Sequence, residues 1–324
     1  MITKRAYLTE KRKFTIKEVD LKPESDEVLV KVAVCGLCNW ELNFWQSNGG
    51  MYSEFPAKLG HEWSGEVIEV GENVTRFKPG DKITSYEFGG FGKYNVAKEG
   101  MCYRVNPEVK YINAMGEPIK CIATTLAGAA PKVGDTGVIV GCGAMGQWCI
   151  QSLTGNSLSH LIAIDIDDKK LELAKMHGAT HTINSKAENA EERVREITGG
   201  VMADFVIEGT GVEQVLSTCT CYLKNRGRLI IMSSHEKPVK EFDFSPVFGK
   251  GLSIIGTSPS YSIDPEEDLR RAAMLINNGA INNEALISHK FDLEDINKAF
   301  DTLENKPAGY IKGIIVCNKD MIEK

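Results

Sequence analysis

The order of apolar and polar positions along the chain changes near residue 118. Before it, short apolar runs rich in β-branched residues are separated by Gly, Pro and Asp. This pattern predicts strands at 14–21, 26–36, 65–71 and 81–87. After it, an Ala- and Thr-rich stretch at 117–130 predicts a helix with Pro118 in its first turn.

From residue 136 onward, buried-type strands alternate with helices. Strands are expected at 136–141, 159–167, 181–185, 203–211, 227–234 and 252–258. Helices are expected at 144–155, 168–178 and 187–200. The tail adds helices at 266–279 and 296–305, a turn-rich stretch at 287–295 and a last strand at 311–318. Strands separated by helices of this length predict a parallel sheet with helices on both faces.

The fold class is therefore expected to be α/β. A β-rich domain is predicted at 1–121, completed by 261–324, and a doubly wound parallel-sheet domain at 122–260. A length of 324 residues agrees with about two domains.

The composition and charge of the chain limit which classes of binding partner are expected. A net charge of −6 with no long basic run argues against nucleic acid or an anionic membrane. The N-terminal stretch has no apolar core, and no apolar run approaches the roughly 18 residues of a membrane helix. Nine scattered cysteines are expected to be thiols or metal ligands in a reducing compartment, so a cytoplasmic location is predicted.

A glycine motif follows the predicted strand at 136–141 and opens the next helix. Gly141, Gly143 and Gly146 form G-x-G-x-x-G, with Ala144 and Met145 inside it. In this context the first glycine permits a tight turn, the second lets backbone approach a pyrophosphate, and the third allows close helix–strand packing. The helix N-terminus attracts the anion. These five residues are predicted to bind a dinucleotide.

The next strand ends at Asp165, about 20 residues past the glycines. An acidic residue there accepts hydrogen bonds from the ribose of NAD and disfavours the 2′-phosphate of NADP. Lys170 follows closely and is a further candidate cofactor contact. The alternative is that Asp165 only caps the following helix.

The metal candidates begin with a Cys-x-x-Cys at Cys35 and Cys38, which by spacing alone suits a structural clamp, a redox pair or a single catalytic ligand. His61 lies beside a glycine just before a predicted strand. Thiolate and imidazole are zinc ligands, and a catalytic site needs three protein ligands and an open position. Glu117 and Cys121, four residues apart on one helical face, are both candidates for the third.

Together these stretches resemble the zinc-dependent medium-chain dehydrogenases, the alcohol, polyol and threonine dehydrogenase group. The resemblance rests on CGLCNWEL, LGHEWSGEVIEVGENVTRFKPGD, GEPIKC, VGDTGVIVGCGAMG and IAIDIDDKKLELAKMHGA. DFVIEGTG and HKFDLEDINKAF extend it over nearly the whole chain. It implies a GroES-like catalytic domain, a Rossmann cofactor domain and a small-molecule alcohol or ketone substrate. Relatives are dimers or tetramers, so a homodimer or homotetramer is expected.

Site residues follow from the resemblance position by position. Cys38 and His61 match the zinc ligands, and Cys35 is not a ligand in the family. Glu62 matches an acid beside the metal that joins its coordination during exchange. Glu41 matches an acid that braces the site.

The resemblance does not decide which residue is the third zinc ligand. Polyol-type members use a Glu at the position of Glu117, and alcohol dehydrogenases a Cys at that of Cys121; the E-P dipeptide favours Glu117. Trp40 departs from the family, which has a Ser or Thr there to relay a proton, and an indole cannot do so. Three alternatives follow: Asn39 or Glu117 relays the proton instead, the reaction is unusual, or Trp40 shapes the pocket.

A second departure is the absence of the cysteine-rich lobe that binds a structural zinc in many members. One zinc and NAD are therefore expected, acting on a secondary alcohol of a polyol, sugar or cyclitol. Polar residues near the expected cleft support that substrate class: Asn39, Asn43, Tyr52 and Glu54. The alternatives are a zinc-free quinone or enoyl reductase and a catalytically silent dinucleotide-binding relative.

Overall fold

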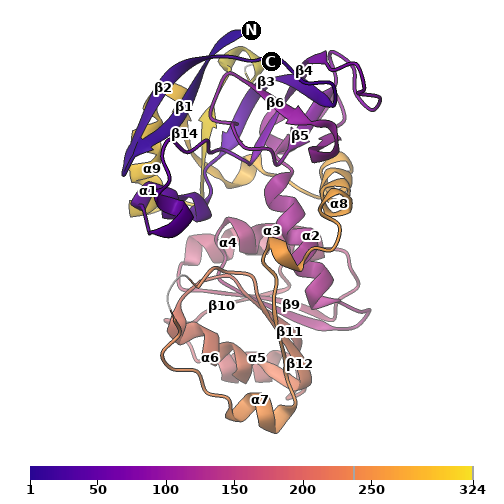
Figure 1. Cartoon of the computed structure of the whole chain (residues 1–324). Coiled ribbons are helices and arrows are strands. Elements are labelled where there is room, and N and C mark those ends of the chain that lie inside the picture. The colour runs from indigo at the N-terminus through magenta and orange to yellow at the C-terminus, as the bar shows by residue number, and fades with distance from the viewer. Residues whose placement is uncertain (236–237, 323–324) are drawn as a thin grey trace. The chain divides into compact units, whose positions relative to one another are not determined.

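The computed structural model describes residues 1–235 and 238–322 (Figure 1). The chain divides into two compact units: Met1–Lys120 with Glu266–Lys324 form unit 1, and Cys121–Pro265 form unit 2. The domain ranges expected from the sequence also include 236–237 and 323–324, which lie outside the described residues. Within the described part, no helix is long and apolar enough to cross a membrane.

Unit 1 is built on β-structure. Its strands are β1 (Ile2–Glu10), β2 (Lys13–Asp20), β3 (Glu27–Gly36), β4 (Trp63–Val70), β5 (Lys82–Ser85), β6 (Tyr94–Lys98), β7 (Cys102–Arg104), β14 (Ile287–Asp292) and β15 (Lys312–Val316). Its helices are α1 (Leu42–Gln46), α8 (Pro265–Asn277), α9 (Ile296–Asn305) and the start of α2 (Glu117–Ala129). The main sheet runs β14-β15-β3-β4-β5-β7, with β6 beside β3, and β1 pairs with β2. β3 is buried at most positions, which explains its nearly continuous apolar sequence.

Two elements of unit 1 differ from expectation. The stretch at 287–295 was expected to be turn-rich, but its first six residues form β14, which pairs in parallel with β15, and only Leu293–Asp295 form a 3₁₀ turn. Its charged and polar residues are tolerated because the strand lies at the sheet edge and is only half buried. β1 was not expected at all; it is held by antiparallel pairing with β2, where Lys4 faces Glu18.

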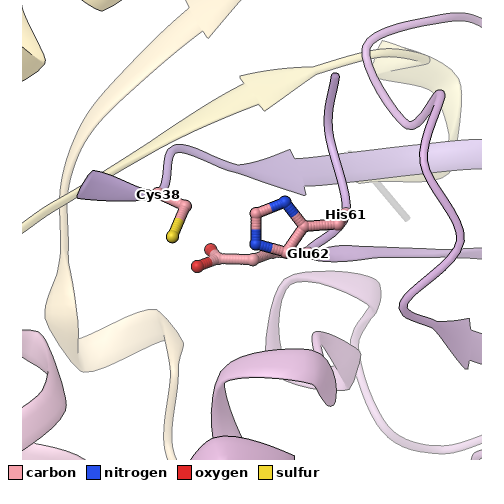
Figure 2. Close-up of side chains that lie close together, drawn as sticks. All are labelled: Cys38, His61 and Glu62. Atoms are coloured by element: carbon pink, nitrogen blue, oxygen red, sulfur yellow. The ribbon is translucent and has the colours of Figure 1, made fainter. Parts of the chain in front are cut away.

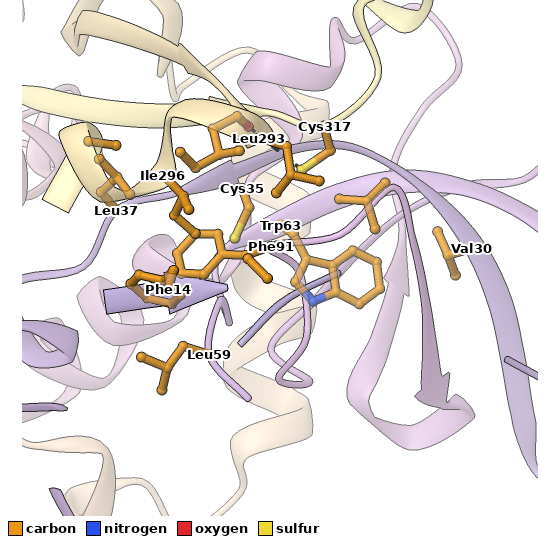
Figure 3. Packing of buried hydrophobic residues seen from close by; sticks show 14 of the residues in the cluster. Phe14, Val30, Cys35, Leu37, Leu59, Trp63, Phe91, Leu293, Ile296 and Cys317 are labelled. Atoms are coloured by element: carbon orange, nitrogen blue, oxygen red, sulfur yellow. Dashed lines mark hydrogen bonds between the residues drawn. The ribbon is translucent and has the colours of Figure 1, made fainter. Parts of the chain in front are cut away.

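The hydrophobic core of unit 1 contains residues from both the N-terminal and the C-terminal part of the chain. The ring of Phe14 lies 5.8 Å from that of Trp45, 6.1 Å from Phe91 and 4.7 Å from Phe300. Cys35 belongs to the same core cluster and is fully buried; Figure 3 shows it near Phe14 and Phe91. α9 and β15 therefore belong to the same packed body as the N-terminal strands.

Unit 2 has the expected parallel sheet. Its strands are β8 (Thr136–Val140), β9 (His160–Asp165), β10 (His181–Asn184), β11 (Ala203–Glu208), β12 (Leu223–Ile231) and β13 (Ser253–Gly256). Its helices are α3 (Ala144–Leu153), α4 (Asp168–Met176), α5 (Ala190–Ile197), α6 (Glu213–Cys221) and α7 (Ser245–Lys250). The order β10-β9-β8-β11-β12-β13 is that of a doubly wound Rossmann sheet, so the α/β prediction is confirmed.

The register of this sheet brings three strand ends together. Val140 pairs with Ile164 on one side and with Glu208 on the other. Because the strands are parallel, the residues that follow them meet at one edge of the sheet. This edge of the sheet therefore brings together Gly141, Asp165 and Glu208.

Candidate functional site

Two neighbouring strands of unit 1 carry the candidate metal ligands. β3 and β4 pair antiparallel with Cys35 opposite Trp63, and the amide of Gly36 donates to the carbonyl of Glu62 at 2.7 Å. Cys38 lies just beyond the end of β3, and His61 just before the start of β4. The strand pairing therefore brings the two loops together.

The side chains of Cys38, His61 and Glu62 converge (Figure 2). Their potential ligand atoms all lie within 4.8 Å of one another; we call these three residues the ligand cluster. A thiolate, an imidazole and a carboxylate around one point suit zinc. Gly36 makes room for the carboxylate, because a Cβ atom there would lie 2.1 Å from Glu62 Oε2.

Glu41 supports His61 from the side of the ring that holds Nδ1. Its Oε1 atom lies 2.9 Å from His61 Nδ1 and accepts a hydrogen bond from the amide of Gly60 at 2.7 Å. Glu41 is fully buried, at the end of the short 3₁₀ turn Asn39–Glu41. A carboxylate bound to Nδ1 leaves Nε2 available to a metal and fixes the ring. The role of Glu41 in bracing a bound metal stays a prediction.

The electrostatics of the ligand cluster favour a cation. Burial lowers the pKa of His61, but Glu41 and Cys38 outweigh it, and the pKa is raised well above its ordinary value. Burial and the Glu62 carboxylate raise the pKa of the Cys38 thiol, with His61 opposing them. A buried thiolate and carboxylates are costly together unless a positive charge compensates them. The cluster therefore fits a divalent metal.

The two candidates for a third ligand both lie on α2. Glu117 is buried, and its Oε2 lies 3.9 Å from His61 Nε2, the nitrogen not used by Glu41. Cys121 belongs to unit 2 and is partly exposed. Within unit 1, Glu117 is thus the candidate next to the free side of the imidazole.

In unit 2, the local geometry differs at each glycine of the G-x-G-x-x-G motif. Gly141 has a φ of +94°, which favours glycine, and a Cβ atom on Gly146 would lie 2.0 Å from the Gly141 carbonyl oxygen. A Cβ on Gly143 would meet nothing within 4 Å. Gly143 precedes α3, whose first residues are Ala144 and Met145. The turn is therefore closed on the protein side and open at Gly143, as a pyrophosphate cradle requires.

Asp165 does not cap the following helix. That role belongs to Asp167, whose side chain accepts from the amide of Lys169. Asp165 instead accepts from the amide of Cys142 at 2.7 Å and from that of Ile166 at 2.7 Å, so it is tied to the glycine turn. The helix-cap alternative is therefore wrong.

Lys170 lies in the first turn of α4 and is partly exposed. Its carbonyl accepts from Gln147 Nε2 on α3 at 2.9 Å. This contact fixes the backbone of Lys170 against the helix that follows the glycine turn. It leaves the role of the Lys170 side chain as a prediction.

Comparison with known proteins agrees with both units. Residues 24–150 match the alcohol dehydrogenase GroES-like domain, and residues 144–277 match the zinc-binding dehydrogenase family. Sorbitol dehydrogenase 1 of Saccharomyces cerevisiae is 31% identical over 85% of this chain and 87% of its own length. The chain belongs to the zinc-dependent medium-chain dehydrogenase family. It is therefore an oxidoreductase by descent.

Other medium-chain dehydrogenases show the breadth of the family. L-threonine 3-dehydrogenase of Bacillus velezensis is 26% identical over 92% of this chain and 94% of its own length. The crystal structure of 2R,3R-butanediol dehydrogenase from Bacillus subtilis has a TM-score of 0.85 at 23% identity, covering 98% of this chain and all of that one. The latter similarity is one of fold.

In this medium-chain dehydrogenase, Trp40 belongs to an aromatic group beside His61. Its ring lies 5.9 Å from the imidazole, 5.1 Å from Phe44, 6.0 Å from Tyr52 and 6.3 Å from Phe88. We call Trp40, Phe44, Tyr52 and Phe88 the aromatic wall. The sequence singled out Trp40 but not Phe44, four residues after it, or Phe88, which comes from the loop after β5.

The polar residues expected near the substrate differ in how exposed they are. Asn39 and Glu54 are exposed, and Tyr52 belongs to the aromatic wall. Asn43, however, is buried, and its side-chain oxygen accepts from Asn48 Nδ2 at 2.7 Å. Asn43 therefore stabilises its own loop, and its place near the substrate stays a prediction.

The sequence also missed Lys312. It is buried on β15, with Nζ 2.5 Å from Glu62 Oε2, and it donates to the carbonyl of Leu37 at 3.0 Å. Only a general preference for pairing buried charges could have predicted a partner for this lysine, and nothing in the sequence names that partner.

Glu208 is a second missed residue. It is fully buried at the end of β11 and accepts from Thr210 Oγ1 at 2.5 Å, from the Gly211 amide at 3.0 Å and from Ser233 Oγ. It thereby ties the loop after β11 to the loop after β12. Since a Cβ on Gly141 would lie 2.8 Å from Thr210 Cγ2, the first of these loops also supports the glycine turn.

Proposed function

We propose that this chain is a zinc-dependent, NAD-linked dehydrogenase that interconverts a secondary alcohol of a polyol, sugar or cyclitol and the corresponding ketone. The observation that carries the proposal is the ligand cluster. It combines a thiol, an imidazole and a carboxylate within 4.8 Å, with Glu41 bound to the far nitrogen of the imidazole.

We assign one zinc to each chain, with Cys38, His61 and Glu117 as its protein ligands. The position of Glu117 near His61 Nε2 supports this choice over Cys121. Glu62 already shares a close ion pair with Lys312, which argues against it as a permanent ligand. Three protein ligands leave the open position that a catalytic zinc needs.

We assign NAD to the glycine turn of unit 2. The open side of Gly143 and the N-terminus of α3 suit a pyrophosphate. The carboxylate of Asp165 suits ribose hydroxyls and repels a 2′-phosphate. A structurally similar Sinorhizobium meliloti protein was crystallised with NADP, so the choice of NAD depends on Asp165 rather than on the fold.

The substrate class rests on relatives and on the aromatic wall. The curated relatives include sorbitol dehydrogenases and a D-arabitol-phosphate dehydrogenase from Enterococcus avium. Trp40 and Phe88 beside His61 offer flat apolar surface, against which the C–H face of a sugar or cyclitol ring packs well.

When bound, zinc supplies the Lewis acidity that lowers the pKa of an alcohol, and the nicotinamide supplies the hydride acceptor. The net reaction converts alcohol and NAD⁺ into ketone, NADH and one proton. The protein orients the reactants. Glu41 keeps its hydrogen bond to His61 Nδ1, and Trp40 has only an N–H donor, so neither His61 nor Trp40 takes up the released proton.

The test combines metal analysis with a substrate screen. The purified protein is expected to hold about one zinc per chain and to reduce NAD with at least one of sorbitol, xylitol and myo-inositol. Cys38→Ala and His61→Ala should lose both zinc and turnover, while Cys35→Ala, buried outside the ligand cluster, should retain zinc. Zinc-free protein that reduces quinones with NADPH would establish the alternative enzyme class. Zinc and NAD binding without turnover on any alcohol would favour the silent relative.

The third ligand is tested in the same assay. Glu117→Gln is expected to lose zinc, and Cys121→Ser to retain it. The opposite pair of results would assign the metal to Cys121 and leave Glu117 available for acid–base work.

A further inference from the structure

Gln147 on α3 is a fully buried amide that no step of the proposed function uses. Its Nε2 donates to the carbonyl of Cys142 at 3.1 Å and to that of Lys170 at 2.9 Å. Its Oε1 lies 2.9 Å from His177 Nδ1. The two carbonyls can only accept, so the nitrogen of the amide must face them and its oxygen must face His177. All the hydrogen atoms of the amide are therefore used, and the side chain is held in one orientation.

His177 anchors this amide from α4. Burial lowers the pKa of His177, so the ring is uncharged at neutral pH and carries one proton. Because Gln147 Oε1 can only accept, that proton lies on Nδ1. Lys170 lies in the first turn of α4 and His177 directly after its last residue, about two turns further along. Gln147 is thus held at two separate points of α4.

Cys142 is the residue between the first two glycines of the turn, and both of its backbone polar groups are fixed. Its amide donates to Asp165 Oδ2 at 2.7 Å, and its carbonyl accepts from Gln147. The peptide bond that joins Cys142 to Gly143 is trans, so its N–H points away from its carbonyl. Because that carbonyl points toward the buried Gln147, the Gly143 N–H points away from Gln147.

The direction of the Gly143 N–H matters for the proposed dinucleotide. Gly143 is the N-cap of α3, so its N–H has no acceptor inside the helix and is available to an anion. With the Cys142–Gly143 peptide reversed, the turn would present a carbonyl oxygen to the pyrophosphate, and two negative groups would face each other. Glycine tolerates the backbone angles of either orientation, so the backbone alone does not prevent this reversal.

We propose that Gln147 is a positioning residue, which holds the Cys142–Gly143 peptide with its N–H directed at the pyrophosphate of the dinucleotide. The inference rests on the proposed function, because it assumes a dinucleotide at the glycine turn. It assigns part of the cofactor site to a side chain that directly follows the last glycine of the G-x-G-x-x-G motif and does not itself contact the cofactor.

Gln147→Leu tests the proposal, because leucine fills the buried position but has no donor for the Cys142 carbonyl. Thr154→Val is the matched control. Thr154 lies at the other end of α3, and its Oγ1 donates to the His177 carbonyl at 2.8 Å. Its replacement therefore also removes a hydrogen bond between the two helices, but far from the glycine turn.

The readout is a pair of dissociation constants, measured by calorimetric titration for NAD and for adenosine, which has the base and ribose but no phosphate. In Gln147→Leu the Kd for NAD is expected to rise about fivefold, the effect of one lost hydrogen bond. The Kd for adenosine should stay at the wild-type value, because adenosine does not use the Gly143 N–H. Thr154→Val should bind both ligands as wild type does.

Three results would overturn the proposal, and a fourth would remove the proposed function. Unchanged NAD affinity in Gln147→Leu would leave the cofactor assignment intact and show that the peptide keeps its direction without Gln147. Equal losses for NAD and adenosine, or an equal loss in Thr154→Val, would show that Gln147 only supports the packing of α3 against α4. Wild-type protein that binds no dinucleotide would remove the proposed function itself. If Gln147→Leu does not fold, Gln147→Met, which also lacks a donor, is measured in its place.

Discussion

The Nδ1 atom of His61 and the Oε1 atom of Glu41 lie 2.9 Å apart, in a part of unit 1 where Glu41 is fully buried. Glu41→Gln keeps the shape but removes the charge that orients and strengthens the imidazole as a ligand. We expect zinc affinity to fall by about 10- to 100-fold, measured by competition with a chelator. Glu54→Gln, in an exposed position of the same unit, is the matched control and should bind zinc as wild type does.

The aromatic wall predicts how substrate preference changes at Trp40. Trp40→Thr removes the flat surface beside His61 and supplies the hydroxyl that the family usually has. Because such ring contacts contribute about 0.5–1.5 kcal/mol, kcat/KM for myo-inositol should fall roughly two- to tenfold relative to that for sorbitol. Trp40→Phe should largely keep the ratio. An unchanged ratio in Trp40→Thr would exclude contact between the indole and a substrate ring.

The glycine turn predicts opposite outcomes for two similar changes. Gly143→Ala adds a methyl group to open space at an ordinary negative φ, so unit 2 should keep its stability while NAD affinity falls. Gly146→Ala forces a Cβ atom to 2.0 Å from the Gly141 carbonyl oxygen and should destabilise the fold by about 1–3 kcal/mol. Thermal unfolding and NAD titration distinguish the two. Equal losses of stability would contradict the assigned roles.

Asp165 predicts the choice of dinucleotide. Ile166, which follows it, is 55% exposed and offers a position for an arginine. Asp165→Ser/Ile166→Arg should lower kcat/KM for NAD about tenfold or more and raise it for NADP, because a positive charge replaces the carboxylate. Ile166→Arg alone is the control and should still prefer NAD. A double variant that prefers NAD as strongly as wild type would show that Asp165 does not select the cofactor.

Glu208 predicts a pH-dependent contribution to stability. Burial raises its pKa, but hydrogen bonds from Ser233, Thr210 and His235 outweigh this and hold the pKa below its ordinary value. A lowered folded-state pKa stabilises the protein above the unfolded-state value, and this contribution is lost as the pH falls through the folded-state value. Glu208→Gln should therefore cost about 1–3 kcal/mol at pH 7, and less in acid.

Denaturant unfolding of both proteins at pH 7 and near pH 4 measures that difference. Glu172→Gln, at an exposed position of α4, controls for loss of a carboxylate elsewhere. A gap between wild type and Glu208→Gln that widens in acid would contradict the prediction.

The parts of the fold that repeat a local pattern were predictable from the sequence. The apolar run at 136–141 followed by spaced glycines indicated β8 and the turn after it. Gly141 and Gly146 are needed there for local reasons, a positive φ or a close approach of neighbouring atoms. β14 and β1 were not predictable in the same way. Each is mostly polar or charged and is a strand because a partner strand supplies its hydrogen bonds.

The residues of the candidate site likewise fall into those that could be predicted from the sequence and those that could not. Cys38 and His61 have side chains of the kind that bind zinc, while the resemblance to the family distinguished Cys38 from Cys35 and named Glu41 as the supporting acid. Lys312 and Phe88 could not be predicted, since their relevance depends on which distant segments β15 and the loop after β5 approach. Sequence distance hides such contacts even when their chemistry is simple.

The pairing of β15 with β3 also has a consequence for the order in which the protein is made. Cys38 and His61 leave the ribosome early, while Lys312 emerges some 250 residues after them. Until then Glu62 lacks the ammonium of Lys312, and the Val34–Gly36 end of β3 lacks its pairing with β15. The charge balance around the buried Glu62 is therefore completed only late in synthesis, by a residue of the C-terminal part of the chain.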